Sequence, residues 1–312
     1  MSRFAAFIAA LAASCAALAQ PFAYVPNEKS GSISIIDTRT DRVAGELPTG
    51  GKPRGIAASP DGRTLYVSEQ QSGALLLFDL DRRELRGRIA LGASPEGIEL
   101  SRDGRWLAAA IEEENAVVLV EVAQGNVAAR IKVDGKNPEH TAFSPDGHWL
   151  LTGAEDGAEV DVIDVAARRQ VDRITVGRRP RGIAFTPDGA RAFVACELDS
   201  AVYVIDMAAR RVERTIRAGE FSNGIVVSPR GDRVYVSNGR GASVTVLDVV
   251  RGEAIATIAV GQRPWNMALT PDGAKLYVAN GRSNSVSVID TATLAHVRDV
   301  PVGESPWGVA IR

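Results

Sequence analysis

The chain has 312 residues, of which 45% are hydrophobic and 24% are charged, and its formal net charge is −2. This composition is typical of a soluble globular protein. Lysines and arginines are mixed with acidic residues along the whole chain. A nucleic-acid-binding surface is therefore not expected, because such a surface needs clustered basic residues.

The first nineteen residues differ from the rest of the chain. One cation, Arg3, precedes an apolar run over residues 4–18, and the run ends in the small-x-small pattern Ala17-Leu18-Ala19. This pattern predicts a secretory signal peptide over residues 1–19, cleaved before Gln20. The alanine-rich style is typical of bacteria, so the predicted location is the periplasm.

Two alternatives to a cleaved signal peptide were weighed. A retained membrane anchor would need about 20 apolar residues, so no membrane span is expected in the mature chain. Lipoprotein processing at Cys15 would need an aliphatic residue one position later than Leu11. If Cys15 leaves with the signal peptide, Cys196 is the single remaining cysteine and no internal disulfide can form.

Residues 20–312 repeat themselves every 42 or 43 residues. Turns of the Pro-Asp-Gly type begin at Ser59, Ser101, Ser144, Thr186, Ser228 and Thr270. An acidic residue closes an apolar strand at Asp37, Asp79, Glu121, Asp164, Asp206, Asp248 and Asp290. A glycine ends each unit at Gly50, Gly92, Gly135, Gly177, Gly219, Gly261 and Gly303. Repeats of this length with four strands predict the blades of a β-propeller.

Each unit divides into four short strands, and the sixth unit is the clearest. Its strands are expected over residues 265–270, 275–280, 285–290 and 296–303. The Asp and Gly of its first turn supply a side-chain cap and a positive φ angle. We interpret Asp272, Asp290 and their counterparts as structural, because symmetric copies cannot all belong to one active site.

The two ends of the repeat region complement each other. Residues 22–27, 32–37 and 42–50 fit the second to fourth strands of a unit, and residues 306–312 fit a lone first strand. Joined in one sheet they close the ring and remove its last open edge. The prediction is an all-β, seven-bladed β-propeller with four antiparallel strands per blade. A linear stack of repeats would need capping units with a polar outer face.

Short motifs in the repeats resemble the YVTN-repeat β-propeller family over all of residues 20–312. The segments are LYVAN, VYVSN and AYVPN, followed by SVSVID and TIAVGQRPW. The Tyr of the motif is matched by Tyr24, Tyr66, Tyr235 and Tyr277, and the Asn by Asn27, Asn238 and Asn280. Ile111, Ala154 and Cys196 stand at the Asn position of the middle blades, where we expect a turn hydrogen bond to be lost.

The length, signal peptide and seven units also resemble a narrower group. Its members are β-propeller proteins associated with pyrroloquinoline-quinone-dependent alcohol catabolism and a transporter. This resemblance implies an accessory role in alcohol oxidation or transport. The sequence itself requires no cofactor, although pyrroloquinoline quinone or a divalent cation is compatible with it.

Positions at which the repeats disagree are the candidate functional residues. By analogy with other propellers, the first strand of each blade lines the central channel. The second residue of each Pro-x-Gly then forms a ring at one mouth: Arg54, Glu96, Glu139, Arg181, Asn223, Trp265 and Trp307. The next position is Gly in five blades and is interrupted by His140 and Asn266.

This ring is interpreted as a platform for a ligand or a partner. Trp265 and Trp307 could stack on a planar group, while Arg54 or Arg181 pairs with carboxylates. A small planar anionic ligand would fit, as would the edge of a periplasmic protein partner. The structural alternative is a set of solvated loop residues. Glu99 replaces a small residue inside an inner strand, and we expect it to meet an Arg or channel water.

The leading hypothesis is a non-enzymatic periplasmic binding or scaffold protein. The runner-up is a lactonase-type propeller hydrolase that holds a divalent metal through Glu96, Glu139, Asn223 and Asn266. A third option is noncovalent haem binding, for which His140 is the one histidine facing the channel. The sequence lacks Cys-x-x-Cys-His, Gly-x-Ser-x-Gly and a Gly-rich phosphate loop.

Overall fold

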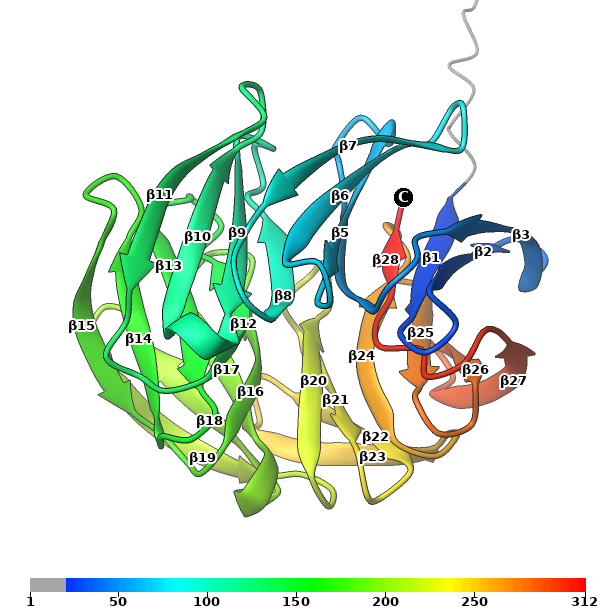
Figure 1. Ribbon diagram of the computed structural model, residues 1–312. Coiled ribbons are helices and arrows are strands. Elements are labelled where there is room, and N and C mark those ends of the chain that lie inside the picture. Colours follow the sequence, from blue (N-terminus) through cyan, green and yellow to red (C-terminus); the bar gives the residue numbers. More distant parts are fainter. Residues whose placement is uncertain (1–20) are drawn as a thin grey trace, which may run out of the picture.

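The repeats fold into seven four-stranded antiparallel sheets arranged as a ring (Figure 1). This computed structural model describes residues 21–312. The predicted signal peptide, its cleavage before Gln20 and the lipoprotein alternative at Cys15 lie outside the described residues. Within residues 21–312, no helix is long and apolar enough to cross a membrane. The predicted all-β, seven-bladed propeller is confirmed.

Blades 1 to 4 follow one another along the chain, and each runs from the channel to the rim. Blade 1 contains β4 (Pro53–Ala58), β5 (Thr64–Glu69), β6 (Ala74–Asp79) and β7 (Glu84–Ala90). Blade 2 contains β8 (Pro95–Leu100), β9 (Trp106–Ile111), β10 (Ala116–Glu121) and β11 (Asn126–Lys132). Blade 3 contains β12 (Pro138–Phe143), β13 (Trp149–Ala154), β14 (Glu159–Asp164) and β15 (Arg169–Thr175). Blade 4 contains β16 (Pro180–Phe185), β17 (Arg191–Cys196), β18 (Ala201–Asp206) and β19 (Arg211–Arg217).

Blades 5 to 7 complete the ring. Blade 5 contains β20 (Ser222–Val227), β21 (Arg233–Asn238), β22 (Ser243–Asp248) and β23 (Glu253–Ala259). Blade 6 contains β24 (Pro264–Leu269), β25 (Lys275–Asn280), β26 (Ser285–Asp290) and β27 (Ala295–Pro301). Blade 7 contains β28 (Ala310–Ile311), β1 (Phe22–Asn27), β2 (Ser32–Asp37) and β3 (Arg42–Pro48). Two short 3-10 helices, η1 (Glu112–Glu114) and η2 (Glu197–Asp199), follow the second strands of blades 2 and 4.

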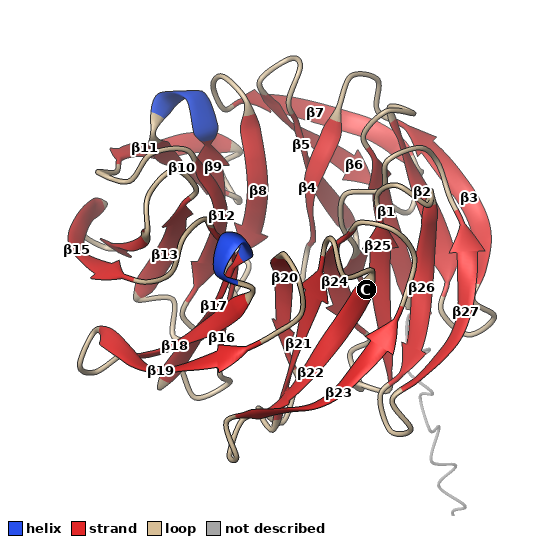
Figure 2. Ribbon diagram, turned by 90° about the horizontal axis from the view of Figure 1, so that it is seen from below, coloured by secondary structure: helices blue, strands red, loops and turns tan. Residues whose placement is uncertain are grey.

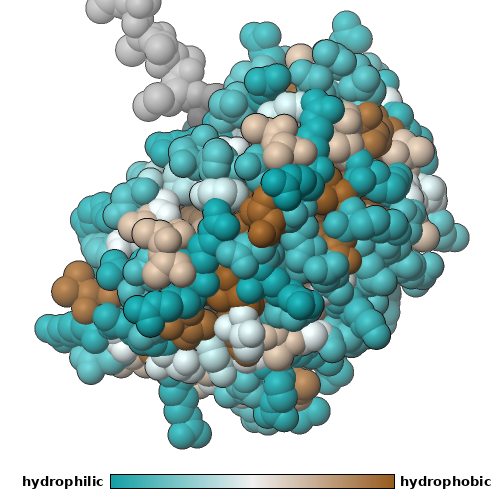
Figure 3. Space-filling view, turned by 90° about the vertical axis from the view of Figure 1, so that its left-hand side faces the viewer, coloured by the Kyte–Doolittle hydropathy of each residue, from teal (hydrophilic) through white to brown (hydrophobic). Residues whose placement is uncertain are grey.

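The hydrophobic core lies between the blades and not in one central cluster. Seven groups of buried apolar side chains each join two adjacent blades, and blades 7 and 1 share one of them. The inner strands surround the centre when the ring is seen along its axis (Figure 2). The face of the molecule in Figure 3 is mostly hydrophilic, with hydrophobic residues in small patches. Each middle strand is buried on both faces, which explains the continuous apolar runs of the sequence.

Strands from the two ends of the described chain share blade 7, as predicted. Ala310 pairs with Tyr24, and the backbone N–H of Arg312 donates to the carbonyl of Phe22 (3.0 Å). The regular pairing covers Ala310–Ile311 and is shorter than the predicted residues 306–312, and a separate bridge joins Pro306 to Asn27. The ring is closed by hydrogen bonds.

The repeated acidic residues are structural, as interpreted. In the first turn, the hydroxyl of Ser59 donates to Asp61 (2.5 Å), and the same carboxylate accepts from the N–H of Arg63 (3.0 Å). The bond from Ser59 lowers the pKa of the Asp61 carboxyl. At the end of a third strand, Asp248 accepts from the N–H of Arg251 (2.8 Å). These carboxylates cap turns.

In blade 5, the Asn of the motif ties the second strand to the loop that enters the blade. The Asn238 side-chain N–H donates to Ser243 (3.0 Å) and Thr245 (2.9 Å), and its oxygen accepts from the N–H of Gly219 (3.0 Å). The expected loss of this turn bond is wrong for blade 3, where Asp161 accepts from the N–H of the equivalent Gly135 (3.1 Å). In blades 2 and 4 a carboxylate binds the N–H of the following residue instead: Glu114 that of Ala93 (3.1 Å) and Asp199 that of Arg178 (2.8 Å).

Candidate functional site at one mouth of the channel

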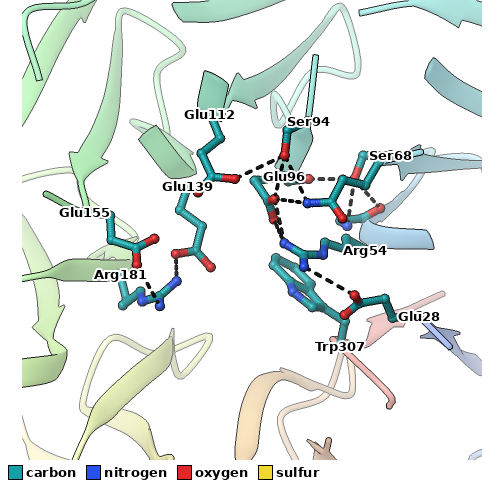
Figure 4. Close-up of polar contacts among 12 residues, drawn as sticks. Glu28, Arg54, Ser68, Ser94, Glu96, Glu112, Glu139, Glu155, Arg181 and Trp307 are labelled. Atoms are coloured by element: carbon teal, nitrogen blue, oxygen red, sulfur yellow. Dashed lines mark hydrogen bonds and ion pairs between the residues drawn. The ribbon is translucent and has the colours of Figure 1, made fainter. Parts of the chain in front are cut away.

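A β-bulge in each inner strand sets the positions of the ring residues. In β4, Pro53 pairs with Glu69 and Ile56 pairs with Val67, so two residues oppose the single residue between Glu69 and Val67. The same shift occurs in β8, β12, β16, β20 and β24. A bulge re-aims side chains away from the regular alternation of a strand. Figure 4 shows five of these ring residues pointing toward the centre of the ring: Arg54, Glu96, Glu139, Arg181 and Trp307.

The Gly of Pro-x-Gly is required by the close approach of neighbouring bulges. A Cβ atom on Gly55 would lie 2.6 Å from the carbonyl oxygen of Glu96, and one on Gly97 would lie 2.7 Å from that of Glu139. Ser68 connects the same two blades, because it accepts from the N–H of Gly55 (2.8 Å) and donates to the carbonyl of Glu96 (2.6 Å). The mouth is therefore built on tightly packed backbone.

Arg54 is held between two carboxylates. Its Nη1 lies 2.5 Å from Oε2 of Glu96, and its Nη2 lies 3.3 Å from Oε1 of Glu28. Glu96 is fully buried and also accepts from the side chains of Gln70 (2.8 Å) and Ser94 (3.3 Å). Burial raises the pKa of Glu96 to about 7, against the opposing effect of Arg54.

Arg181 is the centre of a second ion-pair cluster. It pairs with Glu139, with Glu155 (Nη2–Oε1, 3.1 Å) and with Glu197 (Nε–Oε2, 3.1 Å). The Arg181 residue is 7% exposed, and the side chain of Glu197 is fully buried. A buried cation in this arrangement depends on all three of its carboxylate partners.

Two further arginines connect this cluster to the edge of the mouth. Arg179 pairs with Glu155 and with Glu197 (3.2 Å). Arg263 reaches Oε1 of Glu197 (3.1 Å) from blade 6. The short helix η2, on which Glu197 lies, therefore couples blades 4 and 6.

An aromatic floor spans the channel below these ion pairs. His140 of blade 3 stacks on Trp307 of blade 7 with ring centroids 5.3 Å apart and an interplanar angle of 10°. Trp265 meets Trp307 edge-on at 6.0 Å, and the side-chain N–H of Asn266 donates to the carbonyl of Trp307 (3.4 Å). Burial lowers the pKa of His140 to about 4, so its ring is neutral at pH 7.

A cavity of about 520 Å³ opens above this floor. Five basic residues line it: Lys29, Arg54, Arg240, Arg263 and Arg282. Glu28 is the one acidic residue among the lining residues, and the aromatic rings are Phe221 and Trp265. The guanidinium of Arg240 lies 3.8 Å from the Phe221 ring centroid, and that of Arg263 lies 5.5 Å from Trp265. The mouth is therefore strongly basic on this side.

The nine predicted site residues all lie at this mouth, but in three different roles. Arg54 and Trp265 line the cavity. His140, Asn266 and Trp307 belong to the floor. The other four are buried to 7% exposure or less: Glu96, Glu139, Arg181 and Asn223. The structural alternative, in which the ring residues are solvated loop residues, is therefore wrong, because the bulges turn their side chains toward the channel.

Three cavity residues that the sequence analysis missed carry a clear signal. Lys29, Arg240 and Arg282 each stand two residues after the Asn of the motif, in the three blades that keep that Asn. The same position holds Gln71, Glu113, Asp156 and Leu198 in the other blades. A comparison of the repeats at this second position would have found them.

Glu99 meets a backbone donor instead of an arginine. It lies half-buried at the far end of the channel, where its Oε2 accepts from the backbone N–H of Phe143 in the next blade (2.6 Å). The expectation of an Arg partner is therefore wrong, because the exposed inner edge of β12 supplies the donor. Burial raises the pKa of Glu99 to about 8.

The raised pKa of Glu99 predicts a pH-dependent stability. The folded chain keeps the Glu99 proton up to about pH 8 while the unfolded chain loses it near the ordinary value of 4.5, so stability falls as pH rises between these values. The slope from this group is at most about 1.4 kcal/mol per pH unit. In thermal melts, Glu99→Gln should therefore lose less stability between pH 5 and pH 8 than the unaltered chain. The exposed Glu46→Gln is the control, and equal slopes for both variants would contradict the assignment.

The predicted metal donors do not fit a divalent cation. Glu96 and Glu139 are paired with Arg54 and Arg181 in separate clusters. Among residues 21–312, no three His, Cys, Asp or Glu side chains converge so that they could hold a metal ion. His140 likewise does not present a ring nitrogen to the cavity, because both nitrogens are buried and the ring is covered by Trp307.

The fold and the site together define a seven-bladed β-propeller with an asymmetric, charged channel mouth. A family model described as lactonase, 7-bladed β-propeller matches residues 166–304, and a model of the WD domain, G-β repeat, matches residues 139–158. No curated protein matches the chain.

Solved structures with the same fold include three of different character. Kuenenia stuttgartiensis hydrazine synthase is 26% identical with a TM-score of 0.79, and the match covers 86% of this chain and 92% of that one. A protein of unknown function from Desulfotomaculum acetoxidans is 18% identical with a TM-score of 0.83, covering 93% and 98%. The dihydro-heme d1 dehydrogenase NirN in complex with DHE is 17% identical with a TM-score of 0.70, covering 92% and 74%.

Proposed function

We propose that this chain is an exported, non-enzymatic binding protein that holds a ligand or a segment of a partner protein at the basic channel mouth. The observation that carries the proposal is the convergence of unlike repeat positions on one cavity. Trp265 and the basic lining residues stand where the repeats differ, whereas the symmetric residues cap turns. The repeated residues serve to build the fold, whereas a binding role accounts for the residues that differ between the repeats.

The mouth is organised before any ligand arrives. Arg54 and Arg263 are oriented by buried carboxylates, and the fold fixes Trp265 against the edge of Trp307. Preorganised donors lose little conformational entropy on binding, which favours affinity. The carboxylates of the mouth pair with arginines and not with one another, so the arrangement suits recognition better than acid–base chemistry.

The cellular context comes from the sequence. The signal peptide predicted over residues 1–19 supports a periplasmic location for the mature protein. The resemblance to propellers associated with pyrroloquinoline-quinone-dependent alcohol catabolism gives the system that it would serve, alcohol oxidation or transport. Pyrroloquinoline quinone, which is flat and anionic, is one candidate ligand.

The test is native mass spectrometry, with an absorption spectrum, of the protein isolated from its own periplasm. We expect a chain that begins at Gln20 and carries additional mass, either a small molecule or a partner. Trp265→Ala should lose that mass, and the control Trp106→Ala on blade 2 should keep it. Additional mass that survives in Trp265→Ala would place the binding site elsewhere. A bare chain that also captures no periplasmic protein after cross-linking would contradict the proposal.

A further inference from the structure

The loops above the cavity divide the mouth into a basic half and a non-basic half. Lys29 lies in the loop after β1, Arg240 in the loop after β21 and Arg282 in the loop after β25, so they come from the consecutive blades 7, 5 and 6. All three are exposed and line the cavity. The other four blades place no basic residue at this position.

These loop cations differ from the deeper arginines in their partners. Arg54 and Arg263 are neutralised by buried glutamates. Within residues 21–312, neither Lys29 nor Arg282 forms a salt bridge, and Arg240 only approaches the exposed Glu220 at 3.9 Å. Two of the three loop cations therefore have no ion-pair partner in the described chain, and the third is paired only weakly.

The cavity wall adds flat surfaces to these cations. The Phe221 ring with Arg240 stacked on it, and the Trp265 ring with Arg263 beside it, give the cavity planar walls. Planar walls of this kind favour flat groups.

We infer that the mouth takes a flat organic polyacid whose acid groups pair with Lys29, Arg240 and Arg282 and whose ring lies against the Trp265 side of the cavity. This inference rests on the proposed function and deepens it by naming the ligand class. Two or more acid groups are required, because the three cations come from three separate loops. A single carboxylate could satisfy only one or two of them.

The experiment is isothermal titration of the mature protein with three probes of simple chemistry. Trimesate is flat with three carboxylates, benzoate is flat with one, and citrate has three carboxylates without a ring. We expect trimesate to bind at least about 10-fold more tightly than either of the others, and added NaCl to weaken it. If benzoate binds as tightly as trimesate, the ligand does not need several acid groups. If citrate binds as tightly as trimesate, the ligand does not need a flat ring.

Single variants then locate the site. Lys29→Gln, Arg240→Gln and Arg282→Gln should each weaken trimesate binding about 10-fold, the loss of one charge-assisted hydrogen bond. The control is Arg230→Gln, in the turn after β20 at the opposite end of the channel, which should leave binding unchanged. Three neutral variants without effect would overturn the inference.

The same variants separate this inference from the proposed function. If Arg282→Gln loses the mass that the periplasmic protein carries but trimesate never binds, the ligand class is wrong and the binding mouth stands. If that mass survives in both Arg282→Gln and Trp265→Ala, both proposals fail.

Discussion

Replacement of Arg181 by methionine is expected to lower the free energy of unfolding by about 3–5 kcal/mol, the usual cost of removing one partner from a buried ion pair. The guanidinium pairs with Glu139, Glu155 and Glu197, none of which could reach bulk water easily after its loss. Methionine has a similar length, so the change removes charge more than volume. Urea unfolding followed by tryptophan fluorescence measures the difference.

Two comparisons make this result specific. Arg178→Met removes a neighbouring arginine whose side chain is 69% exposed and pairs with Asp199, so its cost should stay within about 1 kcal/mol. The defect of Arg181→Met should also shrink at acid pH, because the pKa of Glu155 is raised by burial and its protonation removes the repulsion from Glu197. A loss as small as that of Arg178→Met, or one that does not change between pH 5 and pH 8, would show that the cluster is not a charge-balanced unit.

The fold could be predicted from the sequence because its determinants recur at a fixed spacing. The turn hydroxyl of Ser59 and the carboxylate of Asp61 act within a few residues, and five further units repeat the same local chemistry. The shared seventh blade followed from the strands left over at the two ends. The two-residue length of β28 did not follow, because the other six inner strands follow the same repeat and keep six residues.

The site could be predicted only in part because side chains cross between blades. The ring positions Arg54 and Trp265 are set by the local bulge and follow from the repeat. The partners of Arg181 could not be predicted from the repeat, because Glu155 and Glu197 reach it from the ends of second strands. The stacking of His140 on Trp307 across the channel depends on side-chain length and not on repeat position.

The replacement of the motif Asn shows the same limit. In blade 3, Ala154 stands at the Asn position and Asp161 supplies the missing acceptor to Gly135 from the next strand. One backbone N–H is satisfied from two different places in the repeat. An aligned column therefore records a loss where the molecule has conserved the hydrogen bond by another route.

Removal of residues 306–312 is expected to cost about 5 kcal/mol or more, which would lower the melting temperature by about 10 °C or more. These residues bury Trp307 and Val309, which are 4% and 8% exposed. They also supply the backbone bonds from the N–H of Trp307 to the carbonyl of Pro26 (2.9 Å) and from that of Arg312 to Phe22.

The effect is large for two reasons: the deletion removes the strand pairing that closes the ring, and it removes Trp307 from the aromatic floor. Without β28, the inner edge of β1 becomes an open strand edge, and the contacts that β28 makes with β24 of blade 6 and β4 of blade 1 are lost. Arg312→Ala keeps the strand and should change little. A synthetic peptide of residues 306–312, added in excess, should raise the melting temperature of the truncated chain by pairing with β1. A truncated chain that melts with the full-length protein would show that the cores between blades, and not the hydrogen-bonded closure, hold the ring.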